Sequence, residues 1–205
     1  MTYDAAFFDQ IVGASLAAAE VVIPWTLERI PAKTVIDVGC GPGAFLSVAK
    51  RHGCKVVGAD GFVPNGNLLI DESEFVRQDL DNPMSCAGFD LAMCLEVAEH
   101  LPEASAPRLV EQLCKAKYVL WSAAIPGQGG LNHVNEQWST WWEPLFAEQG
   151  YVGSVDIRRA LWDDRRIAGY YRQNLVIWTS PERLADLDMA RGVTDDVHPD
   201  RALGL

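Results

Sequence analysis

Short apolar runs alternate with amphipathic stretches along the first part of the chain. Five runs have the length and the apolar, β-branched character of buried strands: residues 34–40, 54–60, 74–80, 89–96 and 118–124. Residues 43–53 and 106–117 have helical patterns, and the first of these ends with Lys50, Arg51 and then Gly53, as a helix C-terminus should. This alternation predicts parallel strands joined by crossover helices on both faces of one sheet.

The pattern changes after Gly150. Residues 151–159 and 174–180 are strand-like, with no helix of crossover length between them, so we expect them to pair as a closing antiparallel hairpin. Between the two patterns, one helical face carries mostly aromatic residues. Its members are Trp138, Trp141, Trp142, Leu145 and Phe146. Core packing is the favoured interpretation of this face, with Trp138 the member expected to reach a pocket.

These patterns predict a single domain over residues 1–180. Within it we expect one or two N-terminal helices in 1–33, a core of strands and helices in 34–125, and a loop, helix and hairpin in 126–180. Residues 181–205 form a polar tail, expected to contain a short helix and then to fray.

Composition narrows the class of protein. With 205 residues and 49% apolar residues, the chain is long and apolar enough for a core. A net charge of −11 disfavours a long nucleic-acid partner but allows a small-molecule substrate. Five cysteines without a CxxC pair predict reduced thiols and a cytoplasmic location. The oligomeric state is not set by the sequence.

The N-terminal segment has neither the charge of a signal peptide nor the continuity of a membrane span. Asp4 and Asp9 occupy the region where a signal peptide would be basic, and Glu20 and Pro24 interrupt the apolar run. We therefore expect no membrane partner.

A glycine-rich loop, "DVGCGPGAF", follows the first strand and opens a helix. Its glycines permit a tight turn and let backbone N–H groups approach a ligand closely. Asp60 ends the second strand, 21 residues after Gly39, where an acid can accept both hydroxyls of a ribose. Gly39-x-Gly41-x-x-Ala44 also satisfies the dinucleotide fingerprint. The loop alone does not distinguish a nicotinamide cofactor, S-adenosylmethionine or a turn without ligand.

Four successive motifs resemble those of class I S-adenosylmethionine-dependent methyltransferases: "VIDVGCGPGAF", "VVGADG", "VRQDL" and "FDLAMCLEVAEHLP". The resemblance covers about residues 34–125 and implies a Rossmann-like, doubly wound, mostly parallel seven-stranded sheet whose last two strands form an antiparallel hairpin. It implies that Gly39 and Gly41 line the methionine end of the cofactor, Asp60 binds ribose and Asp79 lies near the adenine amino group. The full implied cofactor-binding set is Asp37, Gly39, Cys40, Gly41, Asp60, Gly61, Asp79, Leu80 and Leu95.

The acceptor side is expected in the loop 125–138 and in the connection 162–174. His133 can titrate near neutrality, so it is a candidate to take a proton from a hydroxyl; a histidine that only bonds the loop is the alternative. The connection offers several side chains that either touch an acceptor or are solvated: Arg165, Arg166, Tyr170, Tyr171 and Arg172. The motifs "SAAIPGQGG", "HVNEQW" and "YYRQN" resemble a recurrent subgroup of bacterial and viral methyltransferases, a likeness that names no substrate.

The segment "LEVAEHLP" brings Glu96, Glu99 and His100 together at i, i+3 and i+4, on one face if a helix begins there. With His133 these side chains could hold a divalent ion. The run resembles that of methyltransferases acting on terminal ribose of small RNAs or on catechol-like quinone precursors. Acids in a first helical turn are common without metal, however, and metal-free relatives resemble the same run, so a metal is possible but not favoured.

The sequence therefore favours S-adenosylmethionine-dependent O-methylation of a small molecule or sugar, with Glu96, His100 and His133 as catalytic candidates. The alternatives are metal-assisted methylation of a terminal RNA ribose or a catechol-like acceptor, a non-catalytic cofactor-binding module, and a nicotinamide dehydrogenase.

Overall fold

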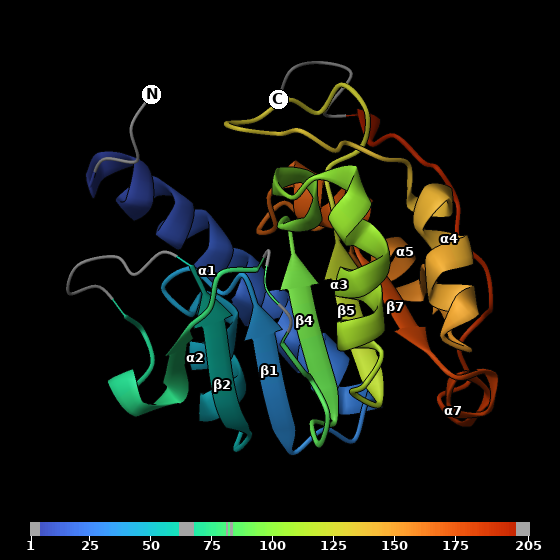
Figure 1. Ribbon diagram of the computed structural model, residues 1–205, viewed down its shortest axis with the longest axis horizontal. Helices are drawn as coiled ribbons and strands as arrows, with labels where there is room; N and C mark the ends of the chain where they lie inside the picture. Colours follow the sequence, from blue (N-terminus) through green and yellow to red (C-terminus); the bar gives the residue numbers. More distant parts are fainter. Residues whose placement is uncertain (1–4, 62–67, 81, 83, 200–205) are drawn as a thin grey trace.

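The computed structural model describes residues 5–61, 68–80, 82 and 84–199, with side chains from residue 12 onward. Its centre is a seven-stranded sheet in the order β3-β2-β1-β4-β5-β7-β6 (Figure 1). The strands are β1 Thr34–Val38, β2 Lys55–Asp60, β3 Phe75–Arg77, β4 Leu91–Leu95, β5 Tyr118–Ser122, β6 Val152–Ser154 and β7 Val176–Thr179. The first five pair in parallel, and β7 pairs antiparallel with both β5 and β6. The predicted fold class is confirmed.

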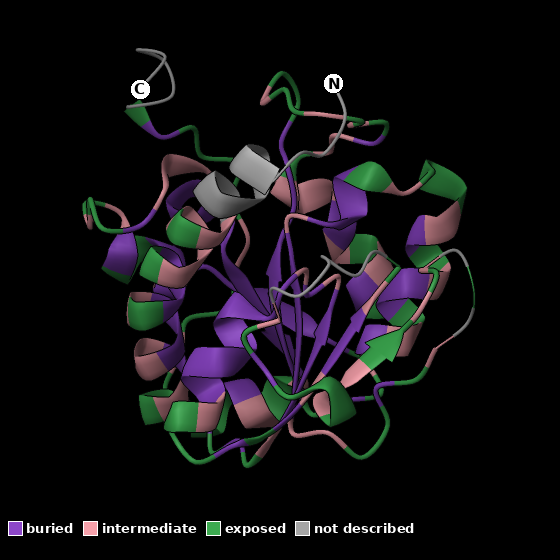
Figure 2. Ribbon diagram, turned by 90° about the vertical axis from the view of Figure 1, so that its left-hand side faces the viewer, coloured by how far each residue is buried: buried purple, intermediate pink, exposed green. Residues whose placement is uncertain are grey.

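Helices cover both faces of the sheet (Figure 1). One face carries α1 Ala5–Arg29, α2 Ala44–Arg51, α5 Asp156–Leu161 and α6 Gly169–Asn174; the other carries α3 Ala106–Leu113 and α4 Ser139–Glu148. Short 3-10 turns lie at Glu72–Glu74, Ala98–His100 and Glu103–Ser105, and α7 is Pro181–Asp186. Figure 2 shows buried central strands between helices whose outer faces are exposed, while the edge strand β3 is largely exposed.

Alternation along the strands builds a separate core on each face. In β4, Leu91, Met93 and Leu95 join the α1/α2 core, whereas Ala92 and Cys94 join the α3/α4 core. Successive strand residues point to opposite faces, so a strand buried on both sides must be apolar throughout. All five residues of β4 are buried, which explains its continuous apolar sequence.

The aromatic face of α4 packs into the α3/α4 core, as predicted. The Trp142 ring lies 4.7 Å from that of Trp121, and Phe146 stacks on Trp178 with 4.1 Å between ring centroids. Trp138 departs from the expectation that it reaches a pocket. It precedes α4 in extended conformation and is 38% exposed, because the helical periodicity from which it was inferred begins only at Ser139.

The N-terminal region forms one helix, α1, which continues through Pro24 and agrees with the prediction of one or two helices. One local prediction needs correction. The strand-like run 151–159 forms a strand only up to Ser154, after which Asp156 begins α5. Helix α5 packs against β7, so its apolar residues Ile157 and Leu161 are buried in a helix rather than a strand.

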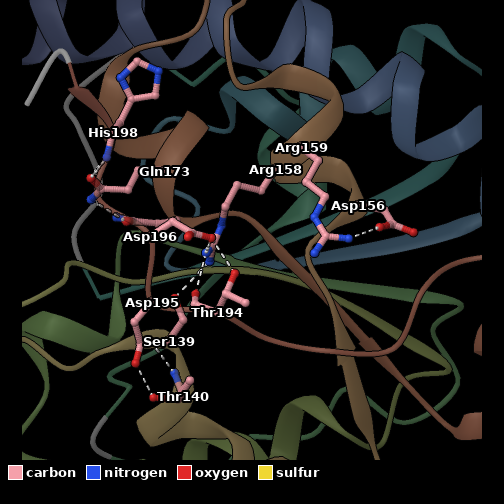
Figure 3. A network of polar contacts seen from close by, with 11 residues as sticks. Ser139, Thr140, Asp156, Arg158, Arg159, Gln173, Thr194, Asp195, Asp196 and His198 are labelled. Carbon is pink, nitrogen blue, oxygen red and sulfur yellow. Dashed lines mark hydrogen bonds and ion pairs between the residues drawn. The ribbon is translucent and has the colours of Figure 1, made fainter.

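The polar tail is docked along the molecule instead of fraying after α7. Residues 190–198, here called the strap, run beside β6, where Gly192 N donates to Gly153 O at 2.9 Å. The buried Arg158 of α5 donates to Thr194 O at 2.6 Å, and Asp195 accepts from the N–H of Thr140 at 2.9 Å (Figure 3). The acidic and carbonyl oxygens of the strap thus meet donors on α4 and α5. Residues 200–205 lie outside the described part of the chain.

All five cysteines are free thiols, four of them buried. Among the described residues, no helix combines the length and apolar character needed to cross a membrane.

Candidate active site

A cavity of about 410 Å³ opens at the carboxyl ends of β1 and β4. Ser15 of α1 and Tyr170 and Tyr171 of α6 line one side, and the loop after β5 lines another. Eight of the twelve residues proposed as catalytic or cofactor-binding meet here: Asp37, Gly39, Cys40, Gly41, Leu95, Glu96, His100 and His133. Open α/β sheets bind ligands in this position.

The glycine loop wraps the end of β1 in a shape that requires glycine. Gly39 has φ +80°, and a Cβ atom there would lie 2.4 Å from a methyl group of Val97. Gly41 also has positive φ, and its N–H donates to the Asp60 carboxylate at 2.8 Å. The acid at the end of β2 therefore orders the loop in addition to the role that the resemblance assigns to it.

Four members of the implied cofactor set lie beyond the cavity, at the ends of β2 and β3. Gln78 N donates to Asp60 O at 2.9 Å, which brings Asp79 beside Gly61. Leu80 is half-buried next to the α3/α4 core. This grouping suits an elongated nucleoside that passes from Gly41 toward β3, and the individual roles of the four stay predictions.

Asp37 lies beneath the loop and is only 3% exposed. Burial raises the pKa of its carboxyl to about 7, and the negative charge of Asp60 contributes. Asp37 is thus an acid whose charge depends on what occupies the cavity: a bound cation would favour its ionised form.

Glu96 is not on a helical face with Glu99 and His100, which corrects the sequence prediction. It is the residue directly after β4, with φ +55°, and its N–H donates to Ser122 O at 3.0 Å. Only Ala98–His100 form a turn of 3-10 helix, since Pro102 follows at once. All three side chains line the cavity, but Glu96 reaches it from the end of β4, whereas Glu99 and His100 reach it from the 3-10 turn.

Two amides hold the Glu96 carboxylate. Asn174 Nδ2 donates to Oε1 at 3.1 Å, and Gln128 Nε2 donates to Oε2 at 2.7 Å. Burial raises the pKa of Glu96, while hydrogen bonds from Asn174, Gln128 and Ser122 oppose this rise. Neither amide was proposed from the sequence. Both lie in motifs that were noted there, "SAAIPGQGG" and "YYRQN", but their meeting depends on the antiparallel direction of β7.

Glu99, His100 and His133 form a separate cluster whose potential ligand atoms lie within 4.8 Å of one another. Glu99 is fully buried, and neither carboxylate oxygen has a hydrogen-bond partner among the described residues. Burial raises the pKa of Glu99 to about 9, and the charge of Glu96 adds to the effect. Burial and the adjacent His133 lower the pKa of His100. This donor set fits a divalent ion.

His133 belongs to a dyad that was not recognised from sequence. Its Nδ1 lies 2.9 Å from Glu136 Oε1, and Glu136 also accepts the N–H groups of Gly127 and Gly129, each at 2.7 Å. Burial alone would raise the pKa of Glu136, but these three hydrogen bonds lower it. Since the ionised carboxylate can only accept a hydrogen bond, Nδ1 carries the proton and Nε2 is left as the acceptor atom. The spacing of three residues between His133 and Glu136 was the available signal.

The side chains of the connection 162–174 lie in three different environments: the cavity wall, the solvent and the side of the strap. Tyr170 and Tyr171 line the cavity, where Phe45 meets Tyr171 edge to face at 5.4 Å. Arg165 and Arg166 are exposed. Arg172 is buried and donates to Trp162 O at 3.2 Å, on the side of the strap. The tyrosines give the acceptor side of the cavity an aromatic wall.

Comparison with known proteins identifies the family. Residues 17–163 match a family model described as a methyltransferase domain. The chain belongs to this methyltransferase family. A ubiquinone biosynthesis O-methyltransferase from Pseudomonas paraeruginosa is 31% identical over 106 residues, which cover 45% of this chain and 45% of that relative. The chain thus matches less than half the length of such curated relatives.

Solved structures share the fold at low identity. DesVI from Streptomyces venezuelae superposes with a TM-score of 0.62 at 12% identity, covering 88% of this chain and 100% of that one. Magnesium protoporphyrin IX methyltransferase from Synechocystis PCC 6803, with bound S-adenosylhomocysteine, superposes with a TM-score of 0.57 at 18% identity. The match covers 88% of this chain and 89% of that one. The methyltransferase family and the fold, both predicted from sequence, are confirmed.

Proposed function

We propose that this methyltransferase O-methylates a small molecule or sugar in the cytoplasm, with His133 as the general base. The observation that carries the proposal is the His133–Glu136 dyad, whose His133 lines the same cavity as the glycine loop. A loop without a catalytic role would not require a half-buried imidazole at the cavity wall with one nitrogen left for an acceptor. The curated O-methyltransferase relative supports the same reaction type.

The chemistry is an in-line displacement. The acceptor oxygen attacks the methyl carbon of the sulfonium, the carbon–sulfur bond breaks, and the products are a methyl ether and S-adenosylhomocysteine. The acceptor proton passes to Nε2 of His133, while Glu136 stabilises the imidazolium that forms. Alignment of oxygen, carbon and sulfur supplies most of the acceleration. Glu96 is proposed to orient the acceptor through a hydroxyl, and His100 packs edge to face on His133 at 4.8 Å.

A labelled-methyl screen against fractionated metabolites tests the proposal, with wild type, His133→Ala, Glu136→Gln and, as control, the exposed His52→Ala. We expect His133→Ala to lower methyl transfer roughly 100-fold and Glu136→Gln to lower it as well, because an amide cannot accept all three hydrogen bonds. Binding of S-adenosylhomocysteine, measured by calorimetry, should stay unchanged in both variants. Normal transfer by His133→Ala would assign the dyad to loop structure. Tight cofactor binding without transfer to any fraction would favour a non-catalytic binding module.

A second candidate function is metal-assisted methylation, favoured by one observation. The Glu99 carboxylate is buried without a partner and shares its cluster with two imidazoles. Glu99, His100 and His133 would hold the ion, and such an ion would lower the pKa of an acceptor hydroxyl. The terminal RNA ribose and the catechol-like diol are the acceptors suited to this version.

Metal dependence separates the two candidates. Turnover that requires magnesium or manganese, is abolished by chelator and is lost in Glu99→Ala would support the metal-assisted version. Turnover that is unaffected by chelator and retained in Glu99→Ala would support His133 as a base acting alone.

A further inference from the structure

A continuous series of buried hydrogen bonds joins the strap to Glu96. His198 N donates to Gln173 Oε1 at 2.9 Å, and Gln173 Nε2 donates to Asn174 Oδ1 at 3.0 Å. Asn174 Nδ2 then donates to Glu96 Oε1 at 3.1 Å and to Gln128 Oε1 at 2.9 Å. Gln173 and Asn174 are each 1% exposed and His198 is 3% exposed, so water does not compete for these bonds. Figure 3 shows the strap end of the series, where Gln173 meets His198.

Each amide in this series can point in only one direction. The backbone N–H of His198 is a donor, so the Gln173 atom facing it must be the oxygen, and the Gln173 nitrogen must face Asn174. The Asn174 oxygen is thereby committed to Gln173, and its nitrogen is committed to Glu96 and Gln128. The strap therefore fixes which end of Asn174 meets the carboxylate.

Topology explains why these residues meet. Strand β7 runs antiparallel to β5, with Val176 opposite Trp121, so the chain just before β7 lies at the edge where the parallel strands end. Asn174 ends α6 at this edge, and Glu96 leaves β4 there. The strap is held in reach of Gln173 by separate contacts, including Arg158 with Thr194 and Thr140 with Asp195 (Figure 3).

We propose that Gln173 and Asn174 are positioning residues that hold the Glu96 carboxylate toward the acceptor, and that the strap completes this arrangement through the His198 N–H. The part concerning the acceptor rests on the proposed function; the hydrogen-bond series can be tested without it. The motif "YYRQN" then supplies both the aromatic wall of the cavity and the amides that orient its acid.

The first test uses NMR of the ¹⁵N-labelled full chain with S-adenosylhomocysteine. The side-chain amide signals of Asn174 are identified by their loss in Asn174→Leu. In Gln173→Glu a carboxylate replaces the amide that donates to Asn174, so Asn174 should flip and present its oxygen to Glu96. We expect its signals to move and its amide protons to exchange at least roughly tenfold faster. The control is Gln112→Glu on α3, which carries the same substitution away from the series.

The strap is tested by a matched pair at one position. His198→Pro removes the N–H that reaches Gln173, whereas His198→Ala keeps it and removes only the ring. His198→Pro should reproduce the effect of Gln173→Glu on the Asn174 signals, and His198→Ala should not. Unchanged Asn174 signals in both Gln173→Glu and His198→Pro would overturn the proposal. Failure of the wild type to bind S-adenosylhomocysteine would instead refute the proposed function, which keeps the two outcomes apart.

The positioning role is tested with the labelled-methyl assay. Gln173→Leu and Asn174→Leu should each lower kcat roughly 10- to 100-fold, the loss expected for one hydrogen bond to a charged group. The KM for S-adenosylmethionine should stay within about twofold, since neither side chain lines the cavity. The double variant should be no worse than Asn174→Leu, because Gln173 acts through Asn174. Multiplying losses, or a raised KM with normal kcat, would contradict the positioning role.

Discussion

The buried acid Glu99 leads to a prediction about stability that needs no acceptor. Its carboxyl is fully buried without a partner, and burial raises its pKa from the ordinary 4.5 to about 9. In the unfolded chain the group ionises above pH 4.5, but the folded protein keeps it protonated up to about pH 9. The folded state therefore binds an extra proton between these values, and its stability falls as the pH rises through this window.

The magnitude follows from the two pKa values. Each pH unit above the unfolded pKa lowers the free energy of unfolding by about 1.4 kcal/mol, which gives about 3 kcal/mol at pH 7. Glu99→Gln has nearly the same shape and no ionisation, so it should be more stable than wild type by this order at pH 7. For a chain of this length the difference corresponds to a Tm higher by about 10 °C. The advantage should be absent at pH 4.5 and should grow toward pH 9.

Thermal unfolding in chelator, measured from pH 5 to pH 8.5, checks this expectation, with the exposed Glu103→Gln as control. Glu103→Gln should follow the wild-type curve at every pH. The reasoning is refuted if Glu99→Gln shows the same pH dependence as wild type, or is the less stable protein at pH 8. Addition of magnesium then bears on the second candidate function: an ion held by Glu99 would stabilise wild type selectively and reduce the advantage of Glu99→Gln.

Three further predictions follow from single contacts. Asp60→Asn removes the charge that accepts the loop N–H and is expected to bind ribose, so calorimetry should show S-adenosylhomocysteine binding weakened roughly 10- to 100-fold; unchanged affinity would refute that role. Gly130→Ala would place a Cβ 2.1 Å from His133 Nε2, so methyl transfer should fall at least roughly tenfold while cofactor affinity stays normal. Trp142→Ala removes a ring that is 1% exposed and should lower the free energy of unfolding by about 3–5 kcal/mol in urea titrations, with cofactor binding retained in the folded protein.

The fold and the cofactor-binding half of the site could be predicted from short stretches of sequence. The loop after β1 and the acid at the end of β2 are each encoded within about ten residues, and parallel β-α-β connections leave few alternatives for where they meet. Eight of the twelve residues proposed as catalytic or cofactor-binding accordingly share one cavity. The same reasoning failed at Glu96, because a helical spacing of three and four residues presupposes a helix, and the chain turns there with positive φ instead.

The acceptor half depends on contacts between segments far apart in sequence. Glu96 and Asn174 are separated by 78 residues and meet only because β7 is inserted antiparallel beside β5. The strap illustrates the same limit. Its polar composition predicted fraying, but the buried Arg158 needs acceptors, and the oxygen atoms of Thr194 and Asp196 supply them. The composition of a segment gives its polarity, but it does not show whether another element offers hydrogen-bond donors to that segment.

The charge of the residues that line the cavity bears on the proposed reaction. Among the described residues that line it there is no lysine or arginine, but there are three acids, Asp37, Glu96 and Glu99. In the proposed reaction the cofactor enters as a sulfonium cation and leaves as a neutral thioether, so the ionised acids among the three favour the reactant over the product and oppose acceptors that carry phosphate or carboxylate. Burial keeps Glu99 protonated near neutral pH, and amide donors rather than cations hold Glu96. A basic partner for Glu96 would cancel its negative field, whereas the neutral amides hold the carboxylate and leave that field in the cavity.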